Sequence, residues 1–481
     1  MLATSKIMKS TLSYTVVSLL GRVISIPKGI IVGLVLLPSD FGLYNSIYIW
    51  FSYLTIVNIG LCTAGSRESA HYFGLEGEES KGVKIQNRAV SFDFLIMLVI
   101  TVAFIIYSLQ QPSLFLIACY VLVGVTYFLN QIGSYYERFN SARNKFVEIA
   151  RANLVRNVVA PLLIMATIYY LKIYALFIVP IVALIVMLIY YGVKLPINFR
   201  FNFDRSGMGH LAYAGLFFGA GAMLSNLYYV VDRTFINMYL DNTVMGLYSF
   251  SMMFVMMIQT FLASFQGIFI DAINKNSSDG DYNLVIQKVM HYNRYLLFFT
   301  FLMIIVSQLG YYFVVEYFVK SYRESNSIFT ILSTMMIFYA IFVIHSPVMA
   351  SKLMRKENYL ALIMLAGVVS AVIFNGIFVY LGWGGEGIAL GTVISQAIMS
   401  VLTIIIVMKN YAGSFSPYFI KNYLIALFLI IYSGFFYYFT TNHYPAGFIT
   451  AYCISAVIGV LAVAQYYYKF NPFRLVFAEQ P

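Results

Sequence analysis

Two short stretches decide the fold: "DFGLYNSIYI" at residues 40–49 and "VMGLYSFSMM" at residues 244–253. Each places Gly-Leu-Tyr at the start of a long apolar run, just after a turn, and the two copies lie 204 positions apart. A second correspondence is looser: the basic loops "SARNKF" (141–146) and "LMRKEN" (353–358) are each followed by a span, a tight turn and another span. This pattern indicates an internal repeat, a common feature of membrane transporters.

The composition is that of a polytopic membrane protein. Of 481 residues, 61% are hydrophobic and 10% are charged, whereas soluble domains carry about 25% charged residues. A helix needs about 20 apolar residues to cross a hydrocarbon core about 30 Å thick. Apolar runs predict fourteen such helices, at residues 11–37, 41–62, 89–109, 113–134, 152–171, 173–193, 210–240, 243–270, 295–318, 328–350, 359–381, 386–408, 422–440 and 447–468.

The repeat divides these spans into two lobes. The predicted domains are an N-terminal lobe with helices 1–6 (residues 1–205), a C-terminal lobe with helices 7–12 (206–412), and a final helix pair with a tail (413–481). Because six is even, both lobes start on the same side of the membrane, so the repeat is parallel. The expected fold is therefore all-α, with two lobes facing each other around an axis along the membrane normal and a substrate path between them.

The net charge of +11 follows the membrane topology. Most Lys and Arg residues fall in alternate loops on the side of the N-terminus, whereas the opposite side holds only Lys172, Lys320 and Arg323. This positive-inside bias predicts that both termini are cytoplasmic. A basic surface that follows topology gives no reason to expect nucleic acid as a partner.

Enzyme chemistry and metal binding find no support in the sequence motifs. Cys62, Cys119 and Cys453 lie in separate spans without paired or metal-site spacing. Walker, His-Glu-x-x-His and Gly-x-Ser-x-Gly motifs are absent from the sequence. We expect neither an enzyme nor a bound cofactor or metal, and coupling to an H⁺ or Na⁺ gradient is left open.

Three segments resemble a known family. "DRTFINMYLDNTVMGLY" (232–248) resembles the seventh-to-eighth helix segment of Wzx-type polysaccharide flippases of the MOP superfamily, which also contains MATE transporters and lipid II flippases. "DFGLYNSIYIWFSYLTIVNIGLCTAGSRE" (40–68) resembles the second helix of that family, and "GWGGEGIALGTVISQAIMS" (382–400) resembles the twelfth. Many members have twelve helices, so the final pair here is a departure that lipid II flippases share.

This resemblance implies a V-shaped transporter in the bacterial inner membrane that moves an isoprenoid (undecaprenyl) diphosphate-linked oligosaccharide by alternating access, for O-antigen or another cell-surface polysaccharide. The implied partners are the lipid-linked substrate, the bilayer, a polysaccharide polymerase and chain-length proteins. The chemistry of such a substrate explains why charge is needed: the diphosphate cannot cross hydrocarbon alone, the sugars need hydrogen bonds, and the lipid tail can stay in the bilayer.

Charged residues inside the spans are the candidate site. Each would cost about 2.5–3.5 kcal/mol at the bilayer centre, so each is expected to face a cavity or a partner. Arg22 and Lys28 lie on the first span, and Asp232 and Arg233 on the seventh. An arginine can bind diphosphate as a forked donor, whereas lysine acts as a compact charge.

The neighbours of the Asp-Arg pair suit a sugar headgroup. Tyr228 falls four positions before Asp232, Tyr229 falls four before Arg233, and Asn226 falls seven before Arg233, so each can share a helix face with one of the two charges. Shifting Lys28 by 204 positions gives Asp232, which predicts that these opposite charges face each other in at least one state of transport. A permanent structural ion pair is the alternative.

Three further residues are secondary candidates. Asp93, near the start of the third span, is a candidate for a coupling proton or sodium ion. Arg156, a few residues into the fifth span, is expected either to reach the cytoplasmic interface, which we favour, or to line the cavity. Arg67 begins a charged stretch whose favoured interpretation is a solvated loop with an interfacial helix.

Two other functions stay open at this point. An ion-coupled small-molecule exporter of the MATE type would share the architecture, but acidic residues would be expected in its cavity. A membrane glycan polymerase or ligase would need a large outer loop with catalytic residues, and the longest predicted outer loop, 319–327, is short.

Overall fold

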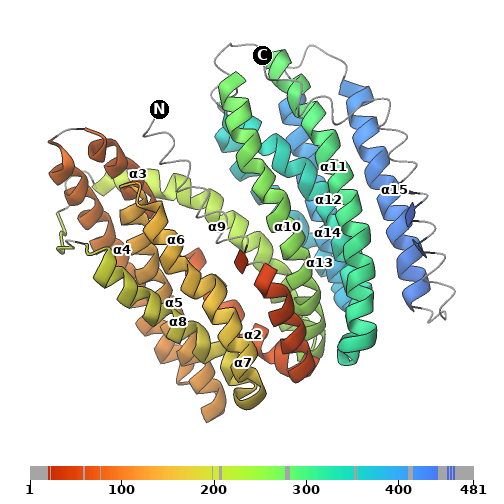
Figure 1. Cartoon of the computed structure of the whole chain (residues 1–481), viewed down its shortest axis with the longest axis horizontal. Helices are drawn as coiled ribbons and strands as arrows, with labels where there is room; N and C mark the ends of the chain where they lie inside the picture. The colour runs from red at the N-terminus through yellow and green to blue at the C-terminus, as the bar shows by residue number, and fades with distance from the viewer. Residues whose placement is uncertain are drawn as a thin grey trace. The chain divides into compact units, whose positions relative to one another are not determined.

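The chain is described by a computed structural model that covers residues 20–21, 23–57, 60–75, 77–197, 199–204, 208–276, 282–351, 354, 356–409, 415–441, 452–453, 456–457 and 459–460. All regular elements within these residues are helices (Figure 1). They are α2 (Pro38–Ile56), α3 (Leu61–Phe73), α4 (Glu79–Ser108), α5 (Leu114–Ser141), α6 (Phe146–Leu154), η1 (Val155–Val159), α7 (Ala160–Leu171), α8 (Ile173–Lys194), α9 (Met208–Tyr239), α10 (Asn242–Asn276), α11 (Tyr282–Phe313), η3 (Val314–Phe318), η4 (Lys320–Tyr322), α12 (Ser325–Ala350), α13 (Glu357–Tyr380), α14 (Gly384–Met408) and α15 (Phe415–Thr441).

The apolar helices agree with the predicted spans. Among the described residues, 10 helical runs are long and apolar enough to cross a membrane, or 11 with the bent pair α2 and α3. These runs match the second to the twelfth predicted spans in order, with α6, η1 and α7 forming the single run Phe146–Leu171. The shorter helix Val23–Val35 represents the first span and α15 the thirteenth. The predicted fourteenth span, 447–468, lies largely outside the described residues.

The second span is broken at a glycine. The axes of α2 and α3 differ by 48°, and Gly60 has a φ of 75°, in the left-handed region that favours glycine. A Cβ at Gly60 would lie 2.6 Å from the carbonyl oxygen of Gly215 in α9, so the close approach of α9 also requires a glycine. The helix then continues to Phe73, beyond the predicted end at residue 62, and places Arg67 on α3 with an exposed side chain.

The Gly-Leu-Tyr repeat produces a symmetric contact between two helix starts. A Cβ on Gly42 of α2 would lie 1.6 Å from the carbonyl oxygen of Asn242, and one on Gly246 of α10 would lie 1.9 Å from that of Pro38. Both glycines and both carbonyls are related by the 204-residue shift. The two copies of the repeat thus pack on each other through equivalent atoms.

The described chain forms two compact units. One contains residues 1–253 and 364–388, and the other contains residues 254–363 and 389–481, so the boundaries fall within α10, α13 and α14. The three domains expected from the sequence, with boundaries after residues 205 and 412, stay a prediction.

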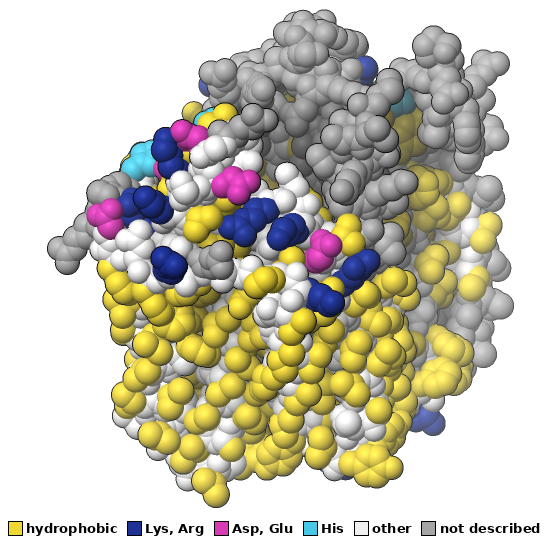
Figure 2. All heavy atoms as spheres, turned by 60° about the vertical axis from the view of Figure 1, so that its left-hand side comes forward, with side chains coloured by type: hydrophobic (Ala, Val, Ile, Leu, Met, Phe, Trp, Pro, Cys, Tyr) yellow, Lys and Arg dark blue, Asp and Glu magenta, His cyan; other side chains and the backbone are white. Residues whose placement is uncertain are grey.

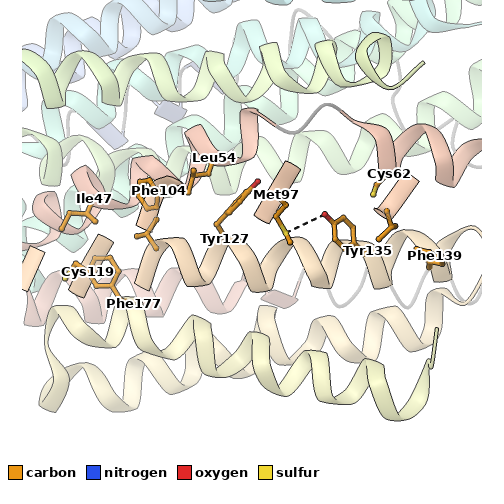
Figure 3. Packing of buried hydrophobic residues seen from close by; sticks show 12 residues of the cluster. Ile47, Leu54, Cys62, Met97, Phe104, Cys119, Tyr127, Tyr135, Phe139 and Phe177 are labelled. Carbon is orange, nitrogen blue, oxygen red and sulfur yellow. Dashed lines mark hydrogen bonds between the residues drawn. The ribbon is translucent and has the colours of Figure 1, made fainter. Parts of the chain in front are cut away.

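The core of the first unit is aromatic and apolar. Buried side chains of α2, α4, α5 and α8 form it, among them Phe104, Tyr127 and Phe177. Figure 3 shows Tyr135 of α5 directed toward Met97 of α4, with Oη 3.8 Å from the sulfur. Contacts among these side chains hold α2, α4, α5 and α8 to one another. They also fix the orientation of α2, which carries Tyr44 and Tyr48.

The second unit contains a buried polar network. The side-chain nitrogen of Gln308 (α11) donates to Ser333 Oγ (α12) at 2.7 Å and to Ser433 Oγ (α15) at 3.0 Å. The hydroxyl of Tyr452 donates to Gln308 Oε1 at 3.3 Å. All four side chains are at most 4% exposed. The thirteenth span and the described part of the fourteenth are therefore fixed to α11 and α12 by hydrogen bonds.

The outer surface is suited to lipid. Figure 2 shows an apolar surface bordered at one end by a band of Lys, Arg, Asp and Glu side chains. Exposed basic residues of the first unit include Arg67, Lys84, Lys145 and Arg151. An apolar belt next to a charged band is the surface expected of a protein that spans a bilayer.

Candidate functional site

The carboxylate of Asp232 is held between three helices. It lies on α9 and is 2% exposed. The hydroxyl of Tyr248 (α10) donates to Oδ2 at 2.7 Å, and the side-chain nitrogen of Asn375 (α13) donates to Oδ1 at 3.0 Å. Each carboxylate oxygen thus has a neutral donor, which stabilises a charge that would be costly in an apolar run.

Arg233 is surrounded by tyrosines. None of the ion pairs between described residues includes it, and its Nε is buried without a hydrogen-bond partner in the described part of the chain. Within electrostatic range of its guanidinium group lie Tyr248, the carboxylate of Asp232, Tyr44 and Tyr48. The rings of Tyr44 and Tyr48 stack on α2 with centroids 5.3 Å apart. Arg233 therefore keeps donors for an anion in a region lined by aromatic hydroxyls.

The polar neighbours predicted on α9 divide between the interior and the surface. Tyr228 is 2% exposed and lies within electrostatic range of Asp232. Its ring contacts that of Tyr229 edge-to-face at 5.4 Å, and Tyr229 is half-buried. Asn226 is exposed. The structure thus brings Tyr228 close to Asp232, whereas Asn226 lies away from the buried carboxylate.

The cations predicted on the first span are only partly described. Lys28 lies half-buried on the helix Val23–Val35, and no ion pair between described residues includes it. Arg22 lies outside the described residues. Since Asp232 here accepts hydrogen bonds from Tyr248 and Asn375, its pairing with Lys28 stays a prediction for another state of transport.

Arg156 lies on a π-helical turn inside its span. The turn η1 (Val155–Val159) interrupts the α-helix between α6 and α7, and such π-bulges often occur at functional sites. Nη2 is 3.8 Å from Oε1 of Glu137 (α5), and Nη1 donates to Asn130 Oδ1 at 3.5 Å. The Tyr48 hydroxyl lies within electrostatic range of Arg156 as well as of Arg233. The structure therefore adds Arg156 to the surroundings of the α2 tyrosines.

Asp93 belongs to a separate buried cluster. It is 4% exposed on α4 and accepts a hydrogen bond of 2.8 Å from the hydroxyl of Tyr135 (α5). The thiol of Cys62 (α3) also donates to it, and Arg138 lies within electrostatic range. Arg138 in turn donates to the hydroxyl of Thr63. This cluster joins α4 and α5 to the first turn of α3, directly after the bend.

Sequence reasoning missed several residues of the site. For two of them a signal existed: Tyr44 and Tyr248 are the tyrosines of the two Gly-Leu-Tyr motifs, 204 positions apart, and they lie beside Arg233 and Asp232. For Tyr48 and Asn375 the sequence holds no comparable signal. The described residues contain no group of three or more His, Cys, Asp or Glu side chains that could hold a metal ion.

Solved structures with the same fold are membrane transporters. The lipid II flippase MurJ, in an inward closed conformation, matches with a TM-score of 0.72 and 15% identity over 95% of this chain and 99% of MurJ. The eukaryotic MATE transporter AtDTX14 matches with a TM-score of 0.55 and 13% identity over 87% and 99%. A multidrug resistance MATE family transporter in an inward-facing conformation matches with a TM-score of 0.53 and 13% identity over 84% and 95%. The chain therefore has the fold of these membrane transporters, which confirms the expected all-α fold class.

Within that class, the chain belongs to the family described as "polysaccharide biosynthesis protein", whose model matches residues 7–269. No curated protein matches the sequence. The match confirms the resemblance to polysaccharide-transport proteins noted at residues 40–68 and 232–248, and residues 382–400 lie beyond the matched range.

Proposed function

We propose that the chain is a flippase that moves an isoprenoid diphosphate-linked oligosaccharide from the cytoplasmic to the outer leaflet for cell-surface polysaccharide synthesis. The observation that carries the proposal is Arg233: a guanidinium group inside an apolar helix, outside every ion pair of the described residues and within electrostatic range of Tyr44 and Tyr48. A charge in this position is costly unless an anion binds it during transport.

The neighbouring residues fit the parts of such a substrate. Asp232 is already bonded to Tyr248 and Asn375, so it leaves the guanidinium of Arg233 able to bind phosphate oxygens as a forked donor. The tyrosine rings offer flat apolar faces and hydroxyls, which suit sugars. The lipid tail of the substrate needs no protein contact, because it can remain in the bilayer.

The remaining parts of the proposal concern the setting of transport. We place the chain in the bacterial inner membrane with both termini cytoplasmic, and we assign alternating access to its two repeats. O-antigen precursors carried on undecaprenyl diphosphate are the proposed substrate class, with a polymerase and chain-length proteins as partners. Coupling to H⁺ or Na⁺ is assigned to Asp93, whose buried carboxylate is held by neutral donors. Comparing translocation with and without an imposed ion gradient tests this assignment.

Sealed vesicles containing the purified protein test the flippase proposal. A membrane-impermeant glycosidase reports how much lipid-linked oligosaccharide has crossed the bilayer. Arg233→Ala is expected to abolish translocation while the protein stays monodisperse, and Arg323→Ala is the control, because Arg323 pairs with Glu316 at an exposed site. Equal translocation by the wild type and Arg233→Ala would remove Arg233 from the path.

An ion-coupled exporter of small molecules is the second candidate. The structural likeness to MATE transporters supports it. Arg233, which belongs to none of the ion pairs between described residues, argues for an anionic substrate instead. Vesicles in which the wild type moves organic cations but no lipid-linked oligosaccharide would establish the exporter.

A further inference from the structure

We propose that Glu137 is an internal competitor for the substrate: its carboxylate pairs with Arg156 in the empty protein, and the diphosphate displaces it to bind between Arg156 and Arg233. This inference rests on the proposed function and specifies how the same site takes its anion. It assigns roles to Arg156 and Glu137 that follow from their geometry.

Arg156 makes only long contacts with its neighbours. Its nitrogen atoms lie 3.8 Å from Glu137 Oε1 and 3.5 Å from Asn130 Oδ1, whereas a charge-assisted N–H···O bond is about 2.7–2.9 Å long. The side chain is 38% exposed and that of Glu137 is 24% exposed. A guanidinium group has five donors in a fixed fork, and these two long contacts do not engage that geometry.

Glu137 is also held loosely on its other side. The hydroxyl of Tyr191 (α8) donates to the same Oε1 atom at 3.4 Å. Tyr191 is fully buried and its ring stacks on Tyr136 at 5.4 Å, so its position is fixed by packing rather than by Glu137. The carboxylate therefore has a neutral donor that can retain it when Arg156 turns to another anion.

Tyr48 lies near two cations of the proposed site. Its hydroxyl lies within electrostatic range of Arg156 on η1 and of Arg233 on α9. Its ring is fixed by stacking on Tyr44 and Phe51, with centroids 5.3 and 5.1 Å apart. A diphosphate has two phosphoryl groups joined by one oxygen, so it offers an anionic group to each arginine and an acceptor to the Tyr48 hydroxyl.

Buried polar atoms next to Arg156 have no hydrogen-bond partner among the described residues. Asn153, on the preceding turn, is 1% exposed, and neither atom of its amide group has a hydrogen-bond partner in the described residues. The Nε of Arg233 is also buried and unpaired there. Buried polar atoms normally have hydrogen-bond partners, so a polar ligand or water is expected beside these atoms.

Competition between Glu137 and the diphosphate for Arg156 predicts specific changes in the Kd of the ligand. Removing the Glu137 charge should strengthen binding of a diphosphate, because the ligand no longer has to displace a carboxylate. A half-exposed ion pair contributes roughly 0.2–1 kcal/mol, so Glu137→Gln should lower the Kd about two- to fivefold. Arg156→Gln should raise the Kd at least about tenfold, because it removes a charged donor from the ligand. In the double variant the Glu137 change should have no further effect.

The test measures the Kd of geranylgeranyl diphosphate for the purified full-length protein in detergent. Geranylgeranyl monophosphate is the ligand control, since it cannot bridge two arginines and should bind more weakly. Glu316→Gln is the matched protein control, because Glu316 also pairs with an arginine, Arg323, but lies on η3 in the other unit. If Glu137→Gln does not give a monodisperse protein, Glu137→Ala serves for the same comparison.

The outcomes separate this inference from the proposed function. Tighter binding by Glu137→Gln alone, lost when Arg156 is also changed, supports the competition. Wild-type binding with an unchanged Kd in Glu137→Gln overturns the competition and leaves the flippase proposal standing. Failure of the wild type to prefer the diphosphate over the monophosphate removes the diphosphate site, and with it both proposals.

Discussion

Alanine at Gly246 is expected to force apart the starts of α2 and α10. Its Cβ would lie 1.9 Å from the carbonyl oxygen of Pro38, whereas real Cβ contacts are essentially never shorter than 3.0 Å. The two backbones must then separate by roughly 1 Å, because a close-packed backbone carbonyl cannot swing away as a side-chain end does. Overpacking of this kind costs about 1–3 kcal/mol. Gly246→Ala should therefore lower the melting temperature of the purified protein.

Two controls make this prediction specific. A Cβ at Gly310 on α11 meets nothing within 4 Å, so Gly310→Ala should raise stability by about 0.5–1 kcal/mol through the helix preference of alanine. Cysteines replacing Ser46 and Asn242, whose side chains are 3.1 Å apart, report the helix contact in a background without the native cysteines. Their cross-linking should fall in Gly246→Ala and persist in Gly310→Ala. Equal melting and equal cross-linking of the two alanine variants would refute the close contact.

The remaining predictions concern a network and a charge pair. Gln308→Ala should destabilise the second unit by about 1–3 kcal/mol, because it removes the buried hydrogen bonds that join α11 to Ser333, Ser433 and Tyr452. Faster hydrogen exchange of α15 than in the wild type would show this, and unchanged exchange would contradict it. For the predicted pair of Lys28 and Asp232, translocation should be lost in Lys28→Asp and in Asp232→Lys and should recover when both are present. A double variant as inactive as the single ones would remove the reason to pair them.

The positions of the spans could be predicted because apolar length is a local property. Each run from the second to the twelfth span was long enough to identify without knowing its neighbours. The bend after α2 was not predicted, because it depends on Gly60 meeting Gly215, which lies far away in the sequence. The extension of that span to Phe73 is polar, and the criterion of apolar length ended it at residue 62.

The charges of the candidate site could be predicted, but their partners could not. Asp232 and Arg233 are conspicuous because charge is rare in such a helix. Asn375, which donates to Asp232, is 143 positions away and sits in an unremarkable apolar run. Glu137 lies three residues beyond the predicted span 113–134, where a carboxylate needs no special explanation. Tertiary proximity assigns these residues to the site, and a single sequence does not contain that information.

Tyr44 and Tyr248 occupy equivalent positions in the two repeats, yet one lies beside a cation and the other is bonded to an anion. A homodimer of one repeat would present identical residues on both sides of its axis, and its two tyrosines would have identical neighbours. Joining the repeats in one chain removes this restriction, since each copy can mutate separately. The proposed site is therefore directional within a repeated scaffold, because the two ends of a ligand bound there would meet different chemistry.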